Sequence, residues 1–297
     1  MDVFKGFPAQ TLDIQGVPIH LRTGGRAGAP ALLLLHGFPQ THRMWRRVAE
    51  QLAGDYFLIM PDLRGYGDSA KLPPCADHAQ ASKRAMAADL VGVLDALGVV
   101  SAHVCGHDRG GRVSHRLALD HPARVNKLCV IDIAPTLDMY AATDMAFARA
   151  YYHWFHLIQP HPLPERMIEG MGRDYLLTKL GGWGGSGTGF IEPEALAEYE
   201  RCFFAPGAVT AACEDYRASA GIDLEHDRAS RAAGQKIAGD LLVLWGARGV
   251  VQRLFRPLEL WQAQCAGRVT GQAMDAGHFI PEELPEATAA ALRSFLG

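Results

Sequence analysis

The sequence predicts an α/β fold, with a mostly parallel β-sheet flanked by helices and a helical cap inserted into it. Short apolar runs with the length of buried strands recur along the chain, and stretches of helical length and period separate them. Such alternation is typical of a parallel sheet that is covered on both faces. The cap is predicted because the alternation stops near Pro135 and resumes near Ile237.

The predicted strands share a short length and an almost wholly apolar composition. They are Ala31–Phe38, Phe57–Asp62, Val99–Gly106, Leu128–Asp132 and Leu241–Gly246. A helix is expected over Met86–Gly98, where the closing glycine suits a helix C-terminus. A second helix is expected over Gly111–Pro122, directly after a predicted strand.

The middle of the chain differs from the rest. It has helical pieces rich in aromatic residues and a proline-rich turn at Gln159–Pro162. We therefore predict a core formed by residues 1–134 and 236–297 and a cap formed by residues 135–235. The glycine-rich stretch Leu180–Gly189 lies inside the cap, where its backbone freedom would suit a mobile loop.

The composition excludes several classes of protein. With 297 residues, of which 48% are hydrophobic and 21% charged, the chain can bury a sizeable core and is not disordered. The net charge of −3 provides no general field for nucleic acid. No leader and no run of roughly 20 apolar residues is present, so we expect a soluble, unprocessed protein with no membrane partner.

The six cysteines show no CxxC pair. Neither a metal site nor a disulfide framework is therefore predicted, and reduced thiols are expected. A reducing, cytoplasmic location follows as the default.

A candidate nucleophile lies in the glycine-rich turn before the second predicted helix. The segment Gly106–Gly111 matches a nucleophile elbow, in which glycines lie two residues either side of the nucleophile, with Asp108 at the centre. The glycines are needed because so sharp a strand-to-helix turn crowds its neighbours, and the helix N-terminus favours an ionised carboxylate. An ordinary glycine-rich turn is the alternative interpretation.

A candidate oxyanion hole follows the first strongly apolar strand. There, His36–Pro39 occupies the position from which this fold class supplies a backbone N–H to the reacting group. The backbone N–H groups of Phe38 and Arg109 are the candidate donors. A structural turn at the end of a strand is the alternative.

The candidate base is His278, in the loop segment Asp275–Pro281 near the C-terminus. It fits the order nucleophile, acid, histidine. The usual position for the acid, after the strand Leu241–Gly246, offers no carboxylate. Asp132, which ends the strand after the nucleophile helix, is therefore the candidate acid, and a cap on a helix or turn is the alternative role for it.

Two arginines suggest an anionic small-molecule substrate. Arg109 and Arg112 are three residues apart in the first turn of the predicted helix, so both can lean over Asp108. An anionic substrate needs them, because two negative charges about 4 Å apart repel by roughly 4 kcal/mol at an effective dielectric constant of 20. A surface pair is the alternative.

The cap contains candidate hydrogen-bond donors for a small leaving anion. His153, Trp154 and Tyr216 carry N–H or O–H groups, and the tryptophan N–H can only donate. Taken alone, the three residues would more often form aromatic packing between cap and core.

Together these segments resemble the α/β-hydrolase superfamily over nearly the whole chain, and within it the fluoroacetate (haloacetate) dehalogenases. The resemblance is carried by HGFPQTHRMW, DLRGYGDS, GHDRGGRVSHRLALDHP, VIDIAPT, YHWF and AGHFIPEE. It implies a hydrolysis of haloacetate to glycolate and halide, without a cofactor or a metal, by a homodimer. The roles that it implies are nucleophile for Asp108, charge pair for Asp132 and His278, substrate carboxylate binding for Arg109 and Arg112, and halide binding for His153, Trp154 and Tyr216.

Two other functions remain open from the sequence. An epoxide hydrolase would share the Asp nucleophile and would use Tyr216 with Tyr151 or Tyr152 as acids on the epoxide oxygen, but it would not need the two arginines. A non-catalytic receptor for a small molecule would bind its ligand without forming a product.

Overall fold

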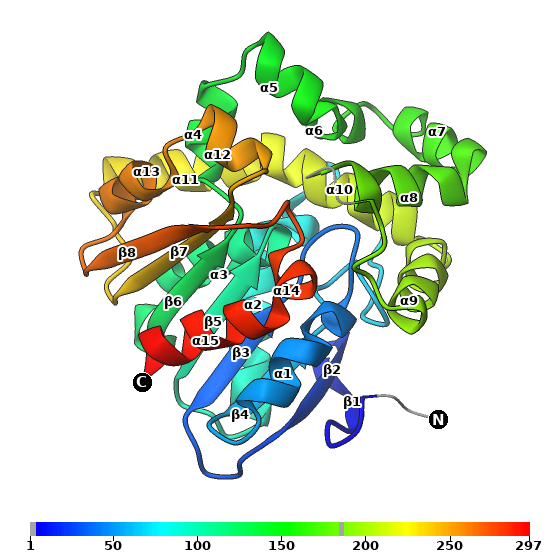
Figure 1. Cartoon of the computed structure of the whole chain (residues 1–297). Coiled ribbons are helices and arrows are strands. Elements are labelled where there is room, and N and C mark those ends of the chain that lie inside the picture. The colour runs from blue at the N-terminus through cyan, green and yellow to red at the C-terminus, as the bar shows by residue number, and fades with distance from the viewer. Residues whose placement is uncertain (1–3, 184–186) are drawn as a thin grey trace.

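A computed structural model, which describes residues 4–183 and 187–297, has a central β-sheet (Figure 1). Its strands are β1 (Ala9–Ile14), β2 (Val17–Gly25), β3 (Ala31–Leu35), β4 (Phe57–Pro61), β5 (Ala102–His107), β6 (Val125–Ile131), β7 (Leu241–Gly246) and β8 (Val269–Met274). Their order in the sheet is β1-β2-β4-β3-β5-β6-β7-β8. Strand β2 pairs antiparallel with β1 and β4, and the other neighbours are parallel. The predicted fold class is therefore confirmed.

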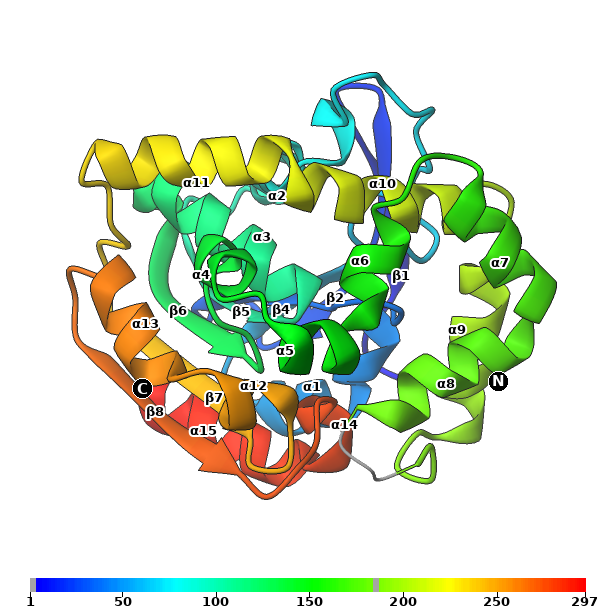
Figure 2. The same cartoon turned by 90° about the horizontal axis from the view of Figure 1, so that it is seen from above.

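Helices cover both faces and one end of this sheet (Figures 1 and 2). They are α1 (Arg46–Leu52), α2 (Lys83–Ala96), α3 (Arg109–Asp120), α4 (Thr136–Ala141), α5 (Met145–Ala150), α6 (Tyr152–Leu157), α7 (Leu163–Met171), α8 (Arg173–Gly182), α9 (Pro193–Phe203), α10 (Ala208–Ala220), α11 (Ile222–Ala232), α12 (Val250–Leu254), α13 (Pro257–Gln264), α14 (Ile280–Glu283) and α15 (Pro285–Leu296). Helices α1 and α15 pack together on one face, and α2 and α3 pack together on the other (Figures 1 and 2).

The apolar runs predicted the central strands well. Strands β3, β4 and β7 begin at the predicted residues, whereas β5 begins at Ala102, three residues later than predicted. The difference arises because the Val99 N–H donates to the carbonyl oxygen of Leu94 and closes helix α2. Gly98 before it has φ +68°, a left-handed conformation that favours glycine at a helix end.

Three outer strands were missed, the edge strands β1 and β8 and the strand β2 next to β1. In β1, β2 and β8 many side chains are exposed or half-buried, and polar residues interrupt the apolar pattern. By contrast, every residue of β3 is buried. Continuous apolar runs indicate strands that are covered on both faces, so they do not reveal strands that are only partly buried.

The segment between β6 and β7 is built from helices α4 to α11. Seen from above, α4, α5 and α6 lie over one end of the sheet, and α10 and α11 form a long bent pair beside them (Figure 2). The division of the chain at residues 134/135 and 235/236 stays a prediction. Part of the predicted loop Leu180–Gly189 belongs to α8, which ends at Gly182, and residues 184–186 lie outside the described residues.

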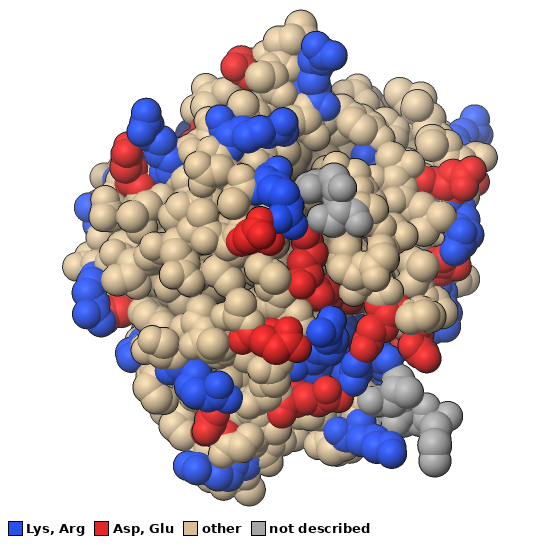
Figure 3. All heavy atoms as spheres, viewed as in Figure 1, with Lys and Arg blue, Asp and Glu red and all other residues tan. Residues whose placement is uncertain are grey.

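Charged residues of both signs are intermixed on the face shown in Figure 3. Ion pairs also connect segments that are far apart in the sequence. For example, Arg293 of α15 contacts Asp55, just after α1, with 2.8 Å between Nε and Oδ2. Exposed pairs of this kind contribute little to stability, so the packing of α1 on α15 rests mainly on buried apolar side chains.

Candidate active site

The turn between β5 and α3 presents Asp108 at the end of the sheet. Asp108 has φ +47° and ψ −114°, a strained backbone conformation for a residue with a side chain. Its neighbours leave no room for larger residues, because a Cβ atom on Gly110 would lie 2.4 Å from the carbonyl oxygens of Leu35 and His36. Close packing of the turn therefore holds the buried Asp108 side chain in one place.

The backbone after β3 contacts the Asp108 carboxylate. The Phe38 N–H donates to Oδ1 of Asp108 at 2.9 Å. The second candidate donor, the N–H of Arg109, lies at the first position of α3, where helix geometry provides no acceptor within the helix. One carboxylate oxygen is thus held by the backbone.

The structure brings His278 and Asp132 together. Nδ1 of His278 lies 2.6 Å from Oδ2 of Asp132, and Oδ1 of Asp132 accepts a hydrogen bond from the N–H of Gly246 at 3.0 Å. Asp132 follows β6 with φ +50°, another left-handed residue at the end of a strand. Nε2 of His278 is buried and has no hydrogen-bond partner among the described residues. The ring is therefore fixed on one side and available on the other.

Opposite charges control the protonation of the two facing groups. Burial alone would raise the pKa of Asp108, but the positive charges of His278, Arg109 and Arg112 lower it below its usual value. Burial alone would also lower the pKa of His278, but the hydrogen bond to Asp132 and the negative charges of Asp132 and Asp108 raise it above 6.5. Asp108 is accordingly ionised near neutral pH.

Arg109 is held by the cap. Its Nε and Nη2 atoms donate to Asp215 of α10 at 2.8 and 2.6 Å, and its guanidinium carbon lies 4.2 Å from the centre of the Tyr216 ring. The side chain is fully buried. Its Nη1 atom has no hydrogen-bond partner in the described part of the chain.

Arg112 has a different environment. Its Nη1 atom donates to the carbonyl oxygen of Ala134 at 3.2 Å and to Oγ1 of Thr136 at 2.9 Å, and its guanidinium lies 4.6 Å from the centre of the Trp154 ring. Burial and the positive charge of Arg109 lower the pKa of Arg112. No carboxylate of residues 4–183 or 187–297 forms an ion pair with this buried cation, and its Nε lacks a partner there.

The cap donors surround the Phe38 ring. His153 stacks on this ring at 6.3 Å between centroids, and Tyr216 meets it edge-on at 5.4 Å. Burial lowers the pKa of His153 and raises that of Tyr216, so both are neutral near pH 7. Nδ1 of His153 and the hydroxyl of Tyr216 have no hydrogen-bond partner among the described residues. Trp154 is also buried, under Arg112.

Trp183 belongs to the site, although the sequence did not identify it as a site residue. Its ring lies 4.5 Å from that of His153 and 5.2 Å from that of His278, and its carbonyl oxygen accepts a hydrogen bond from the His278 N–H at 2.8 Å. The one available signal was a large aromatic side chain isolated among glycines. Its contacts join the cap directly to the loop that carries His278.

The two tyrosines considered for epoxide chemistry differ in burial. Tyr151 is 4% exposed and stacks on Trp154, and the charges of Asp132 and Asp108 contribute to its raised pKa after burial itself. Tyr152 is 45% exposed and carries Lys179 against its ring. Of the pair, only Tyr151 lies close to the candidate nucleophile.

One group of residues outside this site has the spacing of metal ligands. Ligand atoms of His20, His42 and Asp62 lie within 4.8 Å of one another. However, Nδ1 of His42 lies 2.8 Å from Asp62, and Nε2 of His42 accepts a hydrogen bond from Nε of Arg22 at 3.3 Å. The arginine charge disfavours a cation here, so we interpret the group as a structural hydrogen-bond network.

Within the described residues, no helix is both long and apolar enough to cross a membrane.

The chain is similar to several known proteins. The chain is 42% identical to a fluoroacetate dehalogenase from Burkholderia sp over 99% of its length and 95% of the relative. It is 32% identical to a soluble epoxide hydrolase from Corynebacterium sp. (strain C12), over 92% and 91% of the two chains.

A solved structure gives the same result for the fold. A putative α/β hydrolase from Nostoc sp PCC 7120 superposes with a TM-score of 0.95 at 48% identity, over 99% of both chains. The family model that describes the alpha/beta hydrolase fold matches residues 30–283. The chain therefore belongs to the α/β hydrolase fold family.

Proposed function

We propose that the protein is a hydrolytic dehalogenase that converts haloacetates, including fluoroacetate and chloroacetate, to glycolate and halide. The observation that carries this proposal is the buried Arg112, which has no carboxylate partner among the described residues and lies beside a second arginine. A buried charge without an ion-pair partner is costly, and a substrate carboxylate would supply that partner. The similarity to a fluoroacetate dehalogenase supports the same reaction.

The first step would be a displacement at carbon. Oδ1 of Asp108 is held by the Phe38 N–H, which leaves Oδ2 to attack the carbon that bears the halogen. The carbon–halogen bond breaks, halide leaves, and an ester joins Asp108 to the substrate. Unpartnered donors on Arg109 Nη1 and Arg112 Nε would hold the substrate carboxylate.

The second step would hydrolyse this ester. Nε2 of His278 takes a proton from water, and the resulting hydroxide attacks the carboxyl carbon of Asp108. The backbone N–H groups of Phe38 and Arg109 would stabilise the oxyanion. The ester bond then breaks, the glycolate alkoxide takes the proton from His278, and the carboxyl proton of Asp108 passes through His278 to solvent, which restores the carboxylate. The hydrogen bond from His278 to Asp132 supports this role because it stabilises the protonated imidazole.

The cap donors would bind the leaving halide. His153 and Tyr216 are neutral, and each has a buried polar atom without a partner in the described part of the chain, while Trp154 can only donate. Fluoride is small and develops concentrated charge as it leaves, so donors that already point at it lower the barrier.

Two further features stay proposals. All six cysteines are free thiols, which supports a cytoplasmic location. The homodimer rests on the family resemblance alone.

An epoxide hydrolase is the second candidate. Tyr151 is buried near the candidate nucleophile, together with Tyr216, and an epoxide hydrolase is among the relatives. The two activities are distinguished by which compound the protein hydrolyses, a haloacetate or an epoxide.

Incubating the purified protein with fluoroacetate, chloroacetate, chloroacetamide and a simple epoxide tests the proposed function. We expect halide release from both haloacetates, and a kcat/KM for chloroacetamide that is about 100-fold lower because the arginines lose their anionic partner. Halide is measured with an ion electrode and diol by chromatography. Diol without halide would identify an epoxide hydrolase, and ligand-dependent melting without any product would identify a receptor.

Replacing His278 by alanine should trap the ester. The displacement does not need the base, so Asp108 should keep the carboxymethyl group after reaction with haloacetate. Intact-mass spectrometry measures the adduct, and Asp108→Asn is the control that should show none. An unmodified His278→Ala protein after prolonged incubation with substrate would contradict the two-step scheme.

Activity should fall as the pH is lowered through the pKa of His278. The base must be neutral to accept a proton, and its pKa is raised above 6.5, so kcat should fall at a higher pH than an ordinary imidazole would give. The pKa of Asp108 is lowered, so Asp108 stays ionised over this range. In Asp132→Asn the acidic limb of the kcat profile should move to lower pH, and an unchanged limb would show that another group titrates.

The halide donors should matter most for fluoride. We expect Tyr216→Phe and Trp154→Phe to cost about 2 to 4 kcal/mol each in fluoroacetate turnover and much less in chloroacetate turnover. Tyr175→Phe is the matched control, because Tyr175 is a buried cap tyrosine that stacks on Phe203 instead of Phe38. An equal loss of turnover for fluoroacetate and chloroacetate would show that the two residues only contribute packing.

A further inference from the structure

A fully buried carboxylate of the cap, Asp215, contacts the candidate substrate arginine. Its Oδ2 atom accepts hydrogen bonds from Nε of Arg109 at 2.8 Å and from the Tyr66 hydroxyl at 2.5 Å. Its Oδ1 atom contacts Nη2 of Arg109 at 2.6 Å and also Nζ of Lys83. Two cations thus share one carboxylate, in a place without exposure to solvent.

These contacts determine the direction of the Arg109 guanidinium. Its Nε and Nη2 atoms are both occupied, since Nη2 also contacts the carbonyl oxygen of Asp215 at 3.0 Å and Oγ of Ser219 at 2.5 Å. The guanidinium is a planar, rigid fork, so holding one edge fixes the position of the remaining nitrogen. That nitrogen, Nη1, is buried and has no partner in the described residues.

The contacts also cross from core to cap. Arg109 begins α3 of the core, whereas Asp215 and Tyr216 are successive residues of α10. Asp215 accepts a hydrogen bond from one edge of the guanidinium, and the ring of Tyr216 lies against the guanidinium face. A single helix turn of the cap therefore positions both Arg109 and a candidate halide donor.

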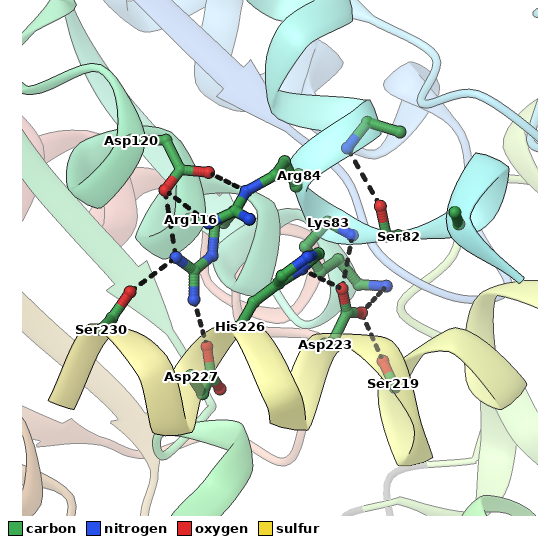
Figure 4. Close-up of polar contacts among 12 residues, drawn as sticks. Ser82, Lys83, Arg84, Arg116, Asp120, Ser219, Asp223, His226, Asp227 and Ser230 are labelled. Carbon is green, nitrogen blue, oxygen red and sulfur yellow. Dashed lines mark hydrogen bonds and ion pairs between the residues drawn. The ribbon is translucent and has the colours of Figure 1, made fainter. Parts of the chain in front are cut away.

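Lys83 affects the charge of this group. Alone, Asp215 would neutralise Arg109 and weaken its attraction for an anion. Lys83, which is buried in α2, contacts Asp215 and also lies 3.2 Å from Oδ2 of Asp223. Figure 4 shows Lys83 reaching toward Asp223, which Ser219 and His226 also contact. Because Asp223 is a second carboxylate, Lys83 offsets one of the two negative charges that Asp215 and Asp223 bring close to Arg109.

We propose that Asp215 is a positioning residue that orients Arg109 toward the substrate carboxylate, and that Lys83 limits the negative charge that Asp215 and Asp223 place beside Arg109. This inference rests on the proposed function, because it names what supports anion binding at the same site. Neither residue needs to touch the substrate. Their effect should appear in substrate binding and leave the chemical steps largely unchanged.

Asp215→Asn tests the positioning role. The amide keeps the shape but removes the charge and one acceptor, so we expect the KM for fluoroacetate to rise at least about tenfold, with kcat changed less than about threefold. Asp227→Asn is the matched control. Asp227 also lies on a helix between β6 and β7 and pairs with an arginine of α3, Arg116, at 2.5 Å (Figure 4). Its substitution should leave KM unchanged.

Lys83 provides a second test, which also covers the case in which Asp215→Asn does not fold. In Lys83→Met the KM should rise by roughly three- to tenfold, because a positive charge near the bound anion is lost. In Lys83→Arg the KM should return close to the wild-type value. Thermal melting shows whether each variant is folded. An unchanged KM in folded Lys83→Met, or an equal rise in Asp227→Asn, would overturn the inference.

Acetate binding separates this inference from the proposed function. Calorimetry with acetate as the probe measures anion binding without any reaction. If the wild-type protein binds acetate but releases no halide, and Asp215→Asn or Lys83→Met binds acetate more weakly, the proposed function fails and the inference stands. If the wild-type protein is active and both variants keep its KM and acetate affinity, the inference alone fails. If the wild-type protein neither binds acetate nor reacts, both fail.

Discussion

A buried carboxylate that stays ionised is the constraint on which the rest of this site depends. Asp108 lies in a strained turn at the end of β5 and is buried. Burial favours its neutral form, and a neutral acid would be a poor nucleophile. The Phe38 N–H and the nearby positive charges of His278 and Arg109 offset that effect. The architecture of the sheet brings these groups together, because β3, β5 and β6 are neighbours and end at the same edge.

Buried cations introduce a second requirement, since each needs a counter-charge. Asp215 provides the counter-charge for Arg109 and also contacts Lys83. The three residues form a chain of alternating charge between cap and core. Arg112 has no such partner within the described residues and lies against the face of Trp154. One arginine of the pair therefore has a carboxylate partner, and the other has only neutral hydrogen-bond partners among the described residues. This asymmetry is a physical reason for an anionic substrate, and it is independent of any relative.

The cap contributes aromatic rings that line the candidate site. Its aromatic rings, those of His153, Tyr216 and Trp183, meet the Phe38 ring of the core. Trp183 also accepts a hydrogen bond from the backbone of His278. Cap position and base position are thus coupled through one residue. Docking of the cap excludes water from the site and strengthens every charge interaction within it.

The sequence by itself determined the parallel sheet, the turn at Asp108 and the order in which the candidate acid and base follow it. These features depend on local chemistry: apolar runs predict buried strands, and glycines predict a turn too tight for other residues. Asp215, Lys83 and Trp183 were not found, because their contacts join segments that lie far apart along the chain. For example, Asp215 is 106 residues from Arg109. Which charged groups and rings meet in the site is decided by the packing of the cap helices against the core. No local sequence pattern shows which residues so far apart along the chain come into contact.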